Sequence, residues 1–309
     1  MTTSTPDLAP AEPAPGGSPP APRGGPRGRV LLTVGLALGG LLVAWAALHL
    51  VDWGLSSTTT TREDYDATAA LDLVAGGDVE VRADDAITGI EVEVVARGGL
   101  VSPRYAVEQV GDRLVLTNEC PAWAWFSWVC SGELHAVVPP ATAVQARTGN
   151  GDVWASGLDA DTELRSANGE VVAGAIGGDL EARSANGDLS LHEIGGDVDA
   201  RSANGEVEVE RVEGRVSAVS SNGDVEVFDV GEGVLARTSN GSVDVSAVGG
   251  DVVARSSNGS VTVIGDGEPV ALTIGTSNGS ETVEGDTDPS ATRTVEVRSS
   301  NGDVAYLGP

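Results

Sequence analysis

The dipeptide Asn-Gly recurs through the C-terminal half of this 309-residue chain and constrains the fold more than any other feature. Its asparagines are Asn150, Asn168, Asn186, Asn204, Asn222, Asn240, Asn258, Asn278 and Asn301. The first six intervals are 18 residues long, and the last two are 20 and 23. A nearly constant period indicates that one short structural unit is repeated and stacked on itself.

Each repeat divides into two nine-residue halves, as in GGDVDARSANGEVEVERV from Gly195 to Val212. A half contains a turn, either Gly-Gly-Asp or Asn-Gly with an acid, followed by residues that alternate between apolar and polar. We expect the turns to use positive φ, which glycine and asparagine tolerate. Alternation at period two predicts strands.

Two arrangements of these strands are open. Hairpins with Asn-Gly turns would give an antiparallel meander, whereas 18-residue coils stacked with parallel strands would give a solenoid. In a meander the identical positions would not lie on one another. Because each position keeps its residue type from repeat to repeat, we predict an all-β fold, a parallel β-solenoid, over residues 146–309.

Stacking would place equal positions in columns. We expect valines and leucines such as Val207 to point inward, with a column of Ser and Thr hydroxyls beside them. We expect the asparagines to form a ladder at one corner, each amide bonding to the next coil. Outward arginines such as Arg165 stand two residues after acids such as Glu163, which predicts a network of salt bridges.

The segment from Val30 to Val51 is apolar and has no formal charge. Twenty-two helical residues are long enough to cross a bilayer, so we predict a transmembrane helix over 30–51. Arginines just before it favour a cytoplasmic N-terminus by the positive-inside rule, with the solenoid extracytoplasmic at the cell membrane. The rival interpretation is a cleaved signal peptide, with Ala44-Trp45-Ala46 as its site. We expect residues 1–29 to be a disordered Pro/Ala/Gly-rich cytoplasmic tail and 52–61 a linker.

Residues 62–145 also alternate like strands, but without a fixed period, so we expect an irregular first part of the solenoid. Within it, Cys120 and Cys130 enclose an aromatic segment, and an oxidising exterior would join the two thiols. We consider two roles for this loop, a plug of the core or an exposed contact with lipid or a partner. Its aromatic residues are Trp123, Trp125, Phe126 and Trp128.

Acids outnumber bases 46 to 18, for a net charge of −28. Such a surface disfavours nucleic acid as a partner. The sequence contains no nucleotide-binding or hydrolase motif and no histidine pair at metal-ligand spacing, so we predict no enzyme activity and no cofactor. A further hypothesis is weak Ca²⁺ binding along one edge, where a cation would relieve repulsion between stacked acids. These acids are Asp152, Glu170, Asp188, Glu206 and Asp224.

The recurring Arg-Ser-Ala-Asn-Gly-Asp/Glu-Val and Ile/Val-Gly-Gly-Asp-Val segments, over roughly residues 70–307, resemble the bacterial adhesin-like β-strand-repeat family of unknown function, which includes LiaG-type envelope proteins. The resemblance implies a right-handed parallel β-solenoid at the cell envelope and no known catalytic residues. We therefore expect a non-catalytic, membrane-anchored protein that contacts a surface or an envelope protein. The alternatives are a membrane protein that senses envelope stress and a weak cation-binding β-roll.

Overall fold

The computed structural model describes residues 26–309, apart from 125, 126 and 128. The described residues divide into two units, one that ends at Leu48 and one that spans His49–Pro309. The helix α1 (Pro26–Gly54) is longer than the predicted 30–51, because proline suits a first helical turn and glycine a helix end. Its segment Val34–Gly54 has a mean hydropathy of 2.1, and its large apolar side chains are exposed. This length and composition fit a membrane anchor and a signal sequence equally.

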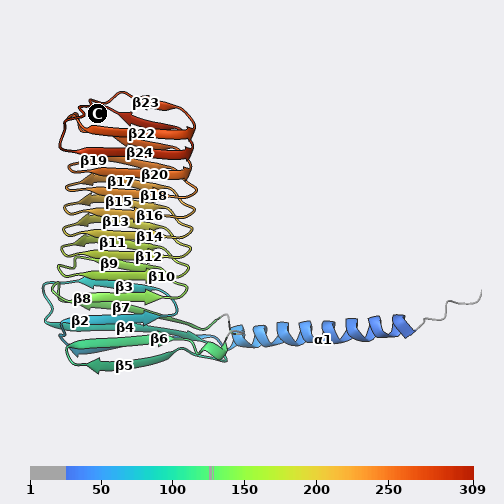
Figure 1. The fold of residues 1–309 in the computed structure, drawn as a ribbon. Helices are drawn as coiled ribbons and strands as arrows, with labels where there is room; N and C mark the ends of the chain where they lie inside the picture. Colours follow the sequence, from blue (N-terminus) through green and yellow to red (C-terminus); the bar gives the residue numbers. More distant parts are fainter. Residues whose placement is uncertain (1–25, 125–126, 128) are drawn as a thin grey trace, which may run out of the picture. The chain divides into compact units, whose positions relative to one another are not determined.

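The β part consists of two long sheets in the described residues (Figure 1). In spatial order, sheet 1 contains β1 (Ser57–Asp66), β4 (Gly89–Gly98), β7 (Ser131–Val138), β3 (Val79–Ala83), β9 (Val153–Ser156), β11 (Val171–Ile176), β13 (Leu189–Ile194), β15 (Val207–Val212), β17 (Val225–Val230), β19 (Val243–Val248), β21 (Val261–Ile264), β25 (Val304–Leu307) and β23 (Glu281–Val283). Sheet 2 contains β22 (Ala271–Asn278), β24 (Thr294–Asn301), β20 (Val252–Asn258), β18 (Val234–Thr238), β16 (Val216–Val219), β14 (Val198–Ser202), β12 (Leu180–Ser184), β10 (Thr162–Ser166), β8 (Ala143–Thr148), β2 (Ala70–Ala75), β6 (Arg113–Glu119) and β5 (Arg104–Val110).

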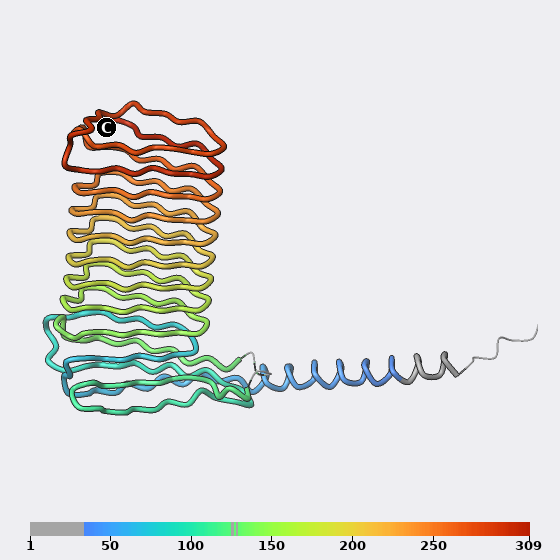
Figure 2. The backbone as a smooth tube through the Cα atoms, viewed as in Figure 1, coloured from blue at the N-terminus to red at the C-terminus, as the bar shows by residue number. Residues whose placement is uncertain are grey.

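One coil of the repeat supplies one strand to each sheet, and coils follow one another along a single axis (Figure 2). Strands of successive coils are parallel and in register with an offset of 18 residues, as in Val207 beside Val225 and Ala182 beside Ala200. The predicted parallel β-solenoid is confirmed, and the antiparallel meander is excluded for the repeats. The core lies between the sheets, where Val207 and Ala200 are fully buried.

The prediction of positive φ at the Asn-Gly turns is wrong for the regular coils. The left-handed residues instead recur once per coil near the ends of the sheet 1 strands, and most are not glycine. They are Gly157, Ala175, Glu193, Arg211, Asp229 and Ala247, with φ between 53° and 75°. The turn glycines are needed for clearance, because a Cβ on Gly205 would lie 2.1 Å from the carbonyl oxygen of Gly187. Glycine therefore recurs at this position of every repeat because successive backbones approach too closely for a side chain.

The last two coils do not stack in chain order, which corrects the expectation of a sequential array. Strand β24 lies between β20 and β22 (Figure 1). In sheet 1, β25 lies between β21 and β23. The C-terminal coil is thus inserted beneath the coil that precedes it in sequence. The 20- and 23-residue intervals mark this region, since longer connections are needed to pass over a coil and return.

The other end of the solenoid is also rearranged. The coil of β2 and β3 lies between that of β6 and β7 and that of β8 and β9. Beyond it, β1, β4 and β7 pair antiparallel in sheet 1, as do β5 and β6 in sheet 2. The predicted irregular first part is present, and β1 begins at Ser57, inside the segment expected to be a linker.

Candidate functional site

The asparagines form the predicted ladder at one corner of the coils. The side-chain amide of Asn204 donates to Oδ1 of Asn186 over 2.9 Å and to the carbonyl of Ala185 over 3.0 Å. The pattern recurs through Asn258, passes to Asn301 and ends at Asn278. The hydroxyl column closes the same turns, since Ser202 Oγ accepts from the N–H of Gly205 and donates to the carbonyl of Gly187. These columns hold successive coils together and are structural.

Outward from sheet 2, arginines and acids form a continuous lattice of ion pairs from β8 to β14. Arg165 contacts Glu163 at 2.6 Å and Glu181 at 2.7 Å. Arg183 lies between Glu181 and Asp199, at 3.1 and 3.8 Å. The hydrogen bond from Arg165 lowers the pKa of the Glu181 carboxyl. The side chains of these pairs are about one-third exposed, so each contributes modestly to stability.

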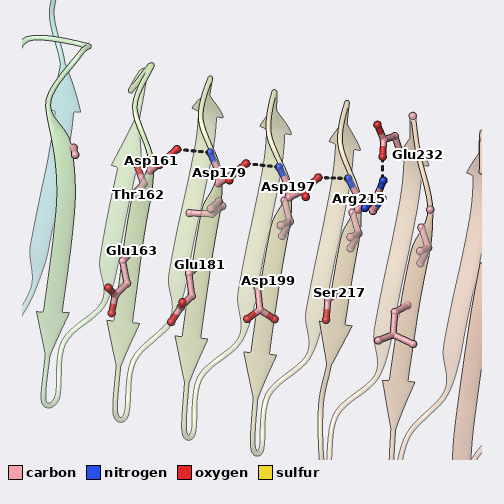
Figure 3. Close-up of a pocket in the computed structure, with 18 of the residues that line it drawn as sticks. Asp161, Thr162, Glu163, Asp179, Glu181, Asp197, Asp199, Arg215, Ser217 and Glu232 are labelled. Atoms are coloured by element: carbon pink, nitrogen blue, oxygen red, sulfur yellow. Dashed lines mark hydrogen bonds and ion pairs between the residues drawn. The ribbon is translucent and has the colours of Figure 1, made fainter.

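Beside this lattice, a groove of about 1140 Å³ crosses the outer face of sheet 2 along the stacking direction. Between the walls the groove runs over the sheet 2 strands, and the aliphatic side chains that face outward along it are Leu235 and Val253, at one end. One wall is the row of lattice acids. The other wall is the aspartate just before each of three sheet 2 strands, the row Asp161, Asp179 and Asp197 (Figure 3). The groove is therefore an elongated trough between two rows of carboxylates.

Each wall aspartate is held in place by the coil that follows it. Oδ1 of Asp161 accepts the backbone N–H of Asp179 over 3.1 Å, and Asp179 accepts that of Asp197 over 2.9 Å. Asp197 in turn accepts the N–H of Arg215 over 2.8 Å (Figure 3). At Arg215, which pairs with Glu232 at 3.0 Å, the row of aspartates is interrupted. The sequence analysis missed this row, although an aspartate at the same position of three successive 18-residue repeats was a sufficient signal.

The acids proposed for Ca²⁺ lie at the opposite corner, after the Asn-Gly turns. There Asp152 and Asp188 accept the backbone N–H of Glu170 and Glu206, each over 2.8 Å. Burial and the neighbouring carboxylates raise the pKa of Glu206, as expected for stacked like charges. Among the described residues, no three His, Cys, Asp or Glu side chains are grouped to hold a metal ion. Calcium binding stays a hypothesis, and a calorimetric titration without heat at millimolar Ca²⁺ would contradict it.

Cys120 and Cys130 form the predicted disulfide, with Cα atoms 6.1 Å apart. Trp123, on the short helix η1 (Ala122–Ala124), is exposed. Trp125, Phe126 and Trp128 lie outside the described residues, so the two roles considered for the loop stay predictions. The sequence analysis did not single out Asp52. This buried carboxylate accepts hydrogen bonds from the N–H of Leu100 (2.7 Å) and from Ser127 Oγ (2.8 Å), and so ties the chain after the apolar segment to the loop.

No family model and no curated protein matches the chain. Among solved structures, a candidate adhesin from Bacteroides fragilis is similar with 14% identity and a TM-score of 0.41, covering 82% of this chain and 97% of that chain. A candidate lipid binding protein from Parabacteroides distasonis has 11% identity and a TM-score of 0.36, covering 81% and 97%. A candidate cell adhesion protein from Clostridium sporogenes has 11% identity and a TM-score of 0.28, covering 82% and 100%. The narrower resemblance to LiaG-type envelope proteins stays a prediction.

Proposed function

We propose that this protein is a non-catalytic envelope protein, anchored in the cell membrane by α1, whose solenoid binds an extended cationic segment of a surface partner. The observation that carries the proposal is the groove on sheet 2. It is long and is bordered by two rows of carboxylates. An extended chain with lysines or arginines would place its cationic side chains against these rows.

The proposal assigns different tasks to the two kinds of acid in the groove. The lattice acids are already paired with arginine. The wall aspartates use Oδ1 for a backbone N–H of the next coil, which leaves Oδ2 to face a ligand. Because these carboxylates are held by the backbone, little conformational entropy is lost when a cation binds them.

Binding of fluorescent decalysine to the full chain in uncharged detergent tests the proposal. The variant Asp179→Asn/Asp197→Asn keeps an oxygen acceptor for the next coil but removes two charges. At about 0.5 kcal/mol for each exposed charge pair, we expect roughly five-fold weaker binding. Asp152→Asn/Asp188→Asn is the matched control, since it removes two equivalent charges from the opposite corner. Equal losses in both variants would mean that only net charge matters and would contradict a role for the groove.

The anchor and its orientation are a separate part of the proposal. They are supported by the exposed apolar segment Val34–Gly54 and by the arginines before it in the sequence. The intact mass of the protein extracted from membranes distinguishes the two interpretations of α1. A mass that includes residues 1–46 supports an anchor, whereas loss of these residues would identify a signal peptide cleaved after Ala46.

A further inference from the structure

The arginine column of sheet 2 changes its surroundings at β16. In β10, β12 and β14, an acid stands two residues before the arginine, as Glu181 does before Arg183. In β16, β18 and β20 the corresponding residues are Ser217, Leu235 and Val253. These three outward positions therefore provide no carboxylate to neighbouring arginines.

Arg237 on β18 shows the consequence. Its side chain is exposed, and within the described part of the chain it has no carboxylate at ion-pair distance. Arg255 and Arg298, on the next two strands, share a single partner, Glu296, at 2.7 and 2.6 Å. Three guanidinium groups on adjacent strands thus face one carboxylate. This local excess of positive charge stands on a chain whose net charge is −28.

A second change occurs at the same end of the column. The residue before each asparagine is alanine in the coils of β10, β12 and β14, as in Ala185. It is serine in the later coils, where the hydroxyls are exposed. Four of these serines line the same groove of about 990 Å³ as Arg237, Arg255 and Arg298; they are Ser239, Ser257, Ser277 and Ser300.

The outermost strand leaves this groove open. Gly275 on β22 pairs with Arg298 and takes the place of an arginine in the column. No side chain covers Arg298 from this position. Guanidinium forks and hydroxyl donors therefore converge on a groove with one lining acid, Glu296, an arrangement that suits a doubly charged oxyanion. A second acid, Glu281, lies at the open edge, where its Oε1 accepts the N–H of Thr276.

We propose that this groove binds a tetrahedral oxyanion, a phosphate or sulfate group, with Arg237 as the arginine that has no acid of its own. The inference is independent of the function proposed above, whose ligand is cationic and binds the acid-walled groove. Loss of acids, gain of hydroxyls and the missing side chain at Gly275 coincide in one place. Each of these changes favours an anion, and salt-bridge packing alone requires none of them.

The test is calorimetry on the full chain in uncharged detergent at about 0.15 M salt, where the Debye length is about 8 Å and the overall repulsion is partly screened. The probes are inorganic tripolyphosphate and soluble short-chain phosphatidylglycerol, which separate a free phosphate from a lipid headgroup. We expect Arg237→Gln to weaken binding at least five-fold. Arg183→Gln, in the same column but between two acids, should leave binding within two-fold of the wild type.

Leu235→Glu is the second variant. It places an acid two residues before Arg237, where Glu181 stands before Arg183 in an earlier coil and pairs with it. The substitution follows the repeat's own pattern, so the fold should be retained, and we expect binding to be lost. Binding of either probe that depends on Arg237 and is removed by Leu235→Glu supports the site, and the probe that binds identifies the source. Absence of binding by both probes at 10 mM would overturn the proposal, as would equal effects of Arg237→Gln and Arg183→Gln.

Discussion

Asn301 donates a side-chain hydrogen bond to Oδ1 of Asn258 over 3.0 Å, although 43 residues separate them in the chain. Asn278, which is nearer to Asn258 in sequence, bonds to Asn301 instead, over 2.9 Å. The ladder therefore records the insertion of the C-terminal coil. The same repeat chemistry would also permit a sequential stack, so the native order depends on the packing of the whole end of the solenoid.

Disulfide trapping checks this order. Thr262 and Ala305 are direct partners on adjacent strands, and Thr282 is one strand further away, beside Ala305. Thr262→Cys/Ala305→Cys should oxidise readily, because adjacent strands lie within disulfide reach at about 4.8 Å. Thr262→Cys/Thr282→Cys should stay reduced. The reverse result, detected by peptide mass spectrometry, would show that the coils stack in chain order.

The Asn-Gly glycines should be sensitive to size and not to φ. In Gly205→Ala, the new Cβ would lie 2.1 Å from the Gly187 carbonyl oxygen, and backbone on both sides resists the shift. We expect a loss of about 3 kcal/mol in unfolding free energy. In Gly157→Ala the nearest atom is 3.5 Å away, and the φ of 75° resembles that of Ala175 at 54°. We expect this control substitution to lower the unfolding free energy, measured by urea denaturation, by about 1 kcal/mol. Similar losses in both variants would contradict the clearance argument.

The asparagine ladder should contribute to stability at every step. Asn204→Ala removes two hydrogen bonds that Asn204 donates and the acceptor of Asn222. We expect a loss of about 1–2 kcal/mol, because the corner is exposed and water replaces part of each bond. Amide hydrogen exchange in the neighbouring coils measures this loss locally, because each coil of a solenoid contacts only the coils next to it. Glu208→Ala, on the exposed face of β15, serves as the control and should change protection little.

The pH dependence of stability should have opposite signs at Glu206 and Glu181. The pKa of Glu206 is raised, so its favourable contribution is present below the unfolded pKa of about 4.3 and is lost as pH rises through the folded pKa. Glu206→Gln should therefore raise the melting temperature at pH 7, and the gain should vanish at low pH. The pKa of Glu181 is lowered by Arg165, so its contribution is present above about 4.3 and is lost as pH falls through the folded pKa.

Glu181→Gln should accordingly lower the melting temperature at pH 7, and this difference from the wild type should decrease as the pH is lowered. Melting curves of the wild type and both variants between pH 7 and pH 3 give the comparison directly. If the two variants shift the melting temperature in the same direction at pH 7, the assignment of repulsion to one acid column and pairing to the other is wrong.

Residue spacing alone determined the main architecture. The 18-residue recurrence of asparagine and the alternation around residues such as Val207 specify parallel coils, because only stacking places identical side chains in contact. The arginine–acid lattice and the asparagine ladder follow from the same periodicity. The two cysteines could be paired from their short separation and the expected compartment.

Tertiary structure decided the features that break the period or depend on backbone conformation. Because the coils are alike, each could pair with any of several others. The sequence therefore could not show that Asn301 lies next to Asn258 in the ladder and that Asn278 lies beyond Asn301. Residue type could not show that Arg211 and Asp229 adopt left-handed φ while the turn glycines serve clearance. The solitary position of Arg237 likewise depends on which strands lie beside it, because an ion pair is set by distances between coils and not by spacing along the chain.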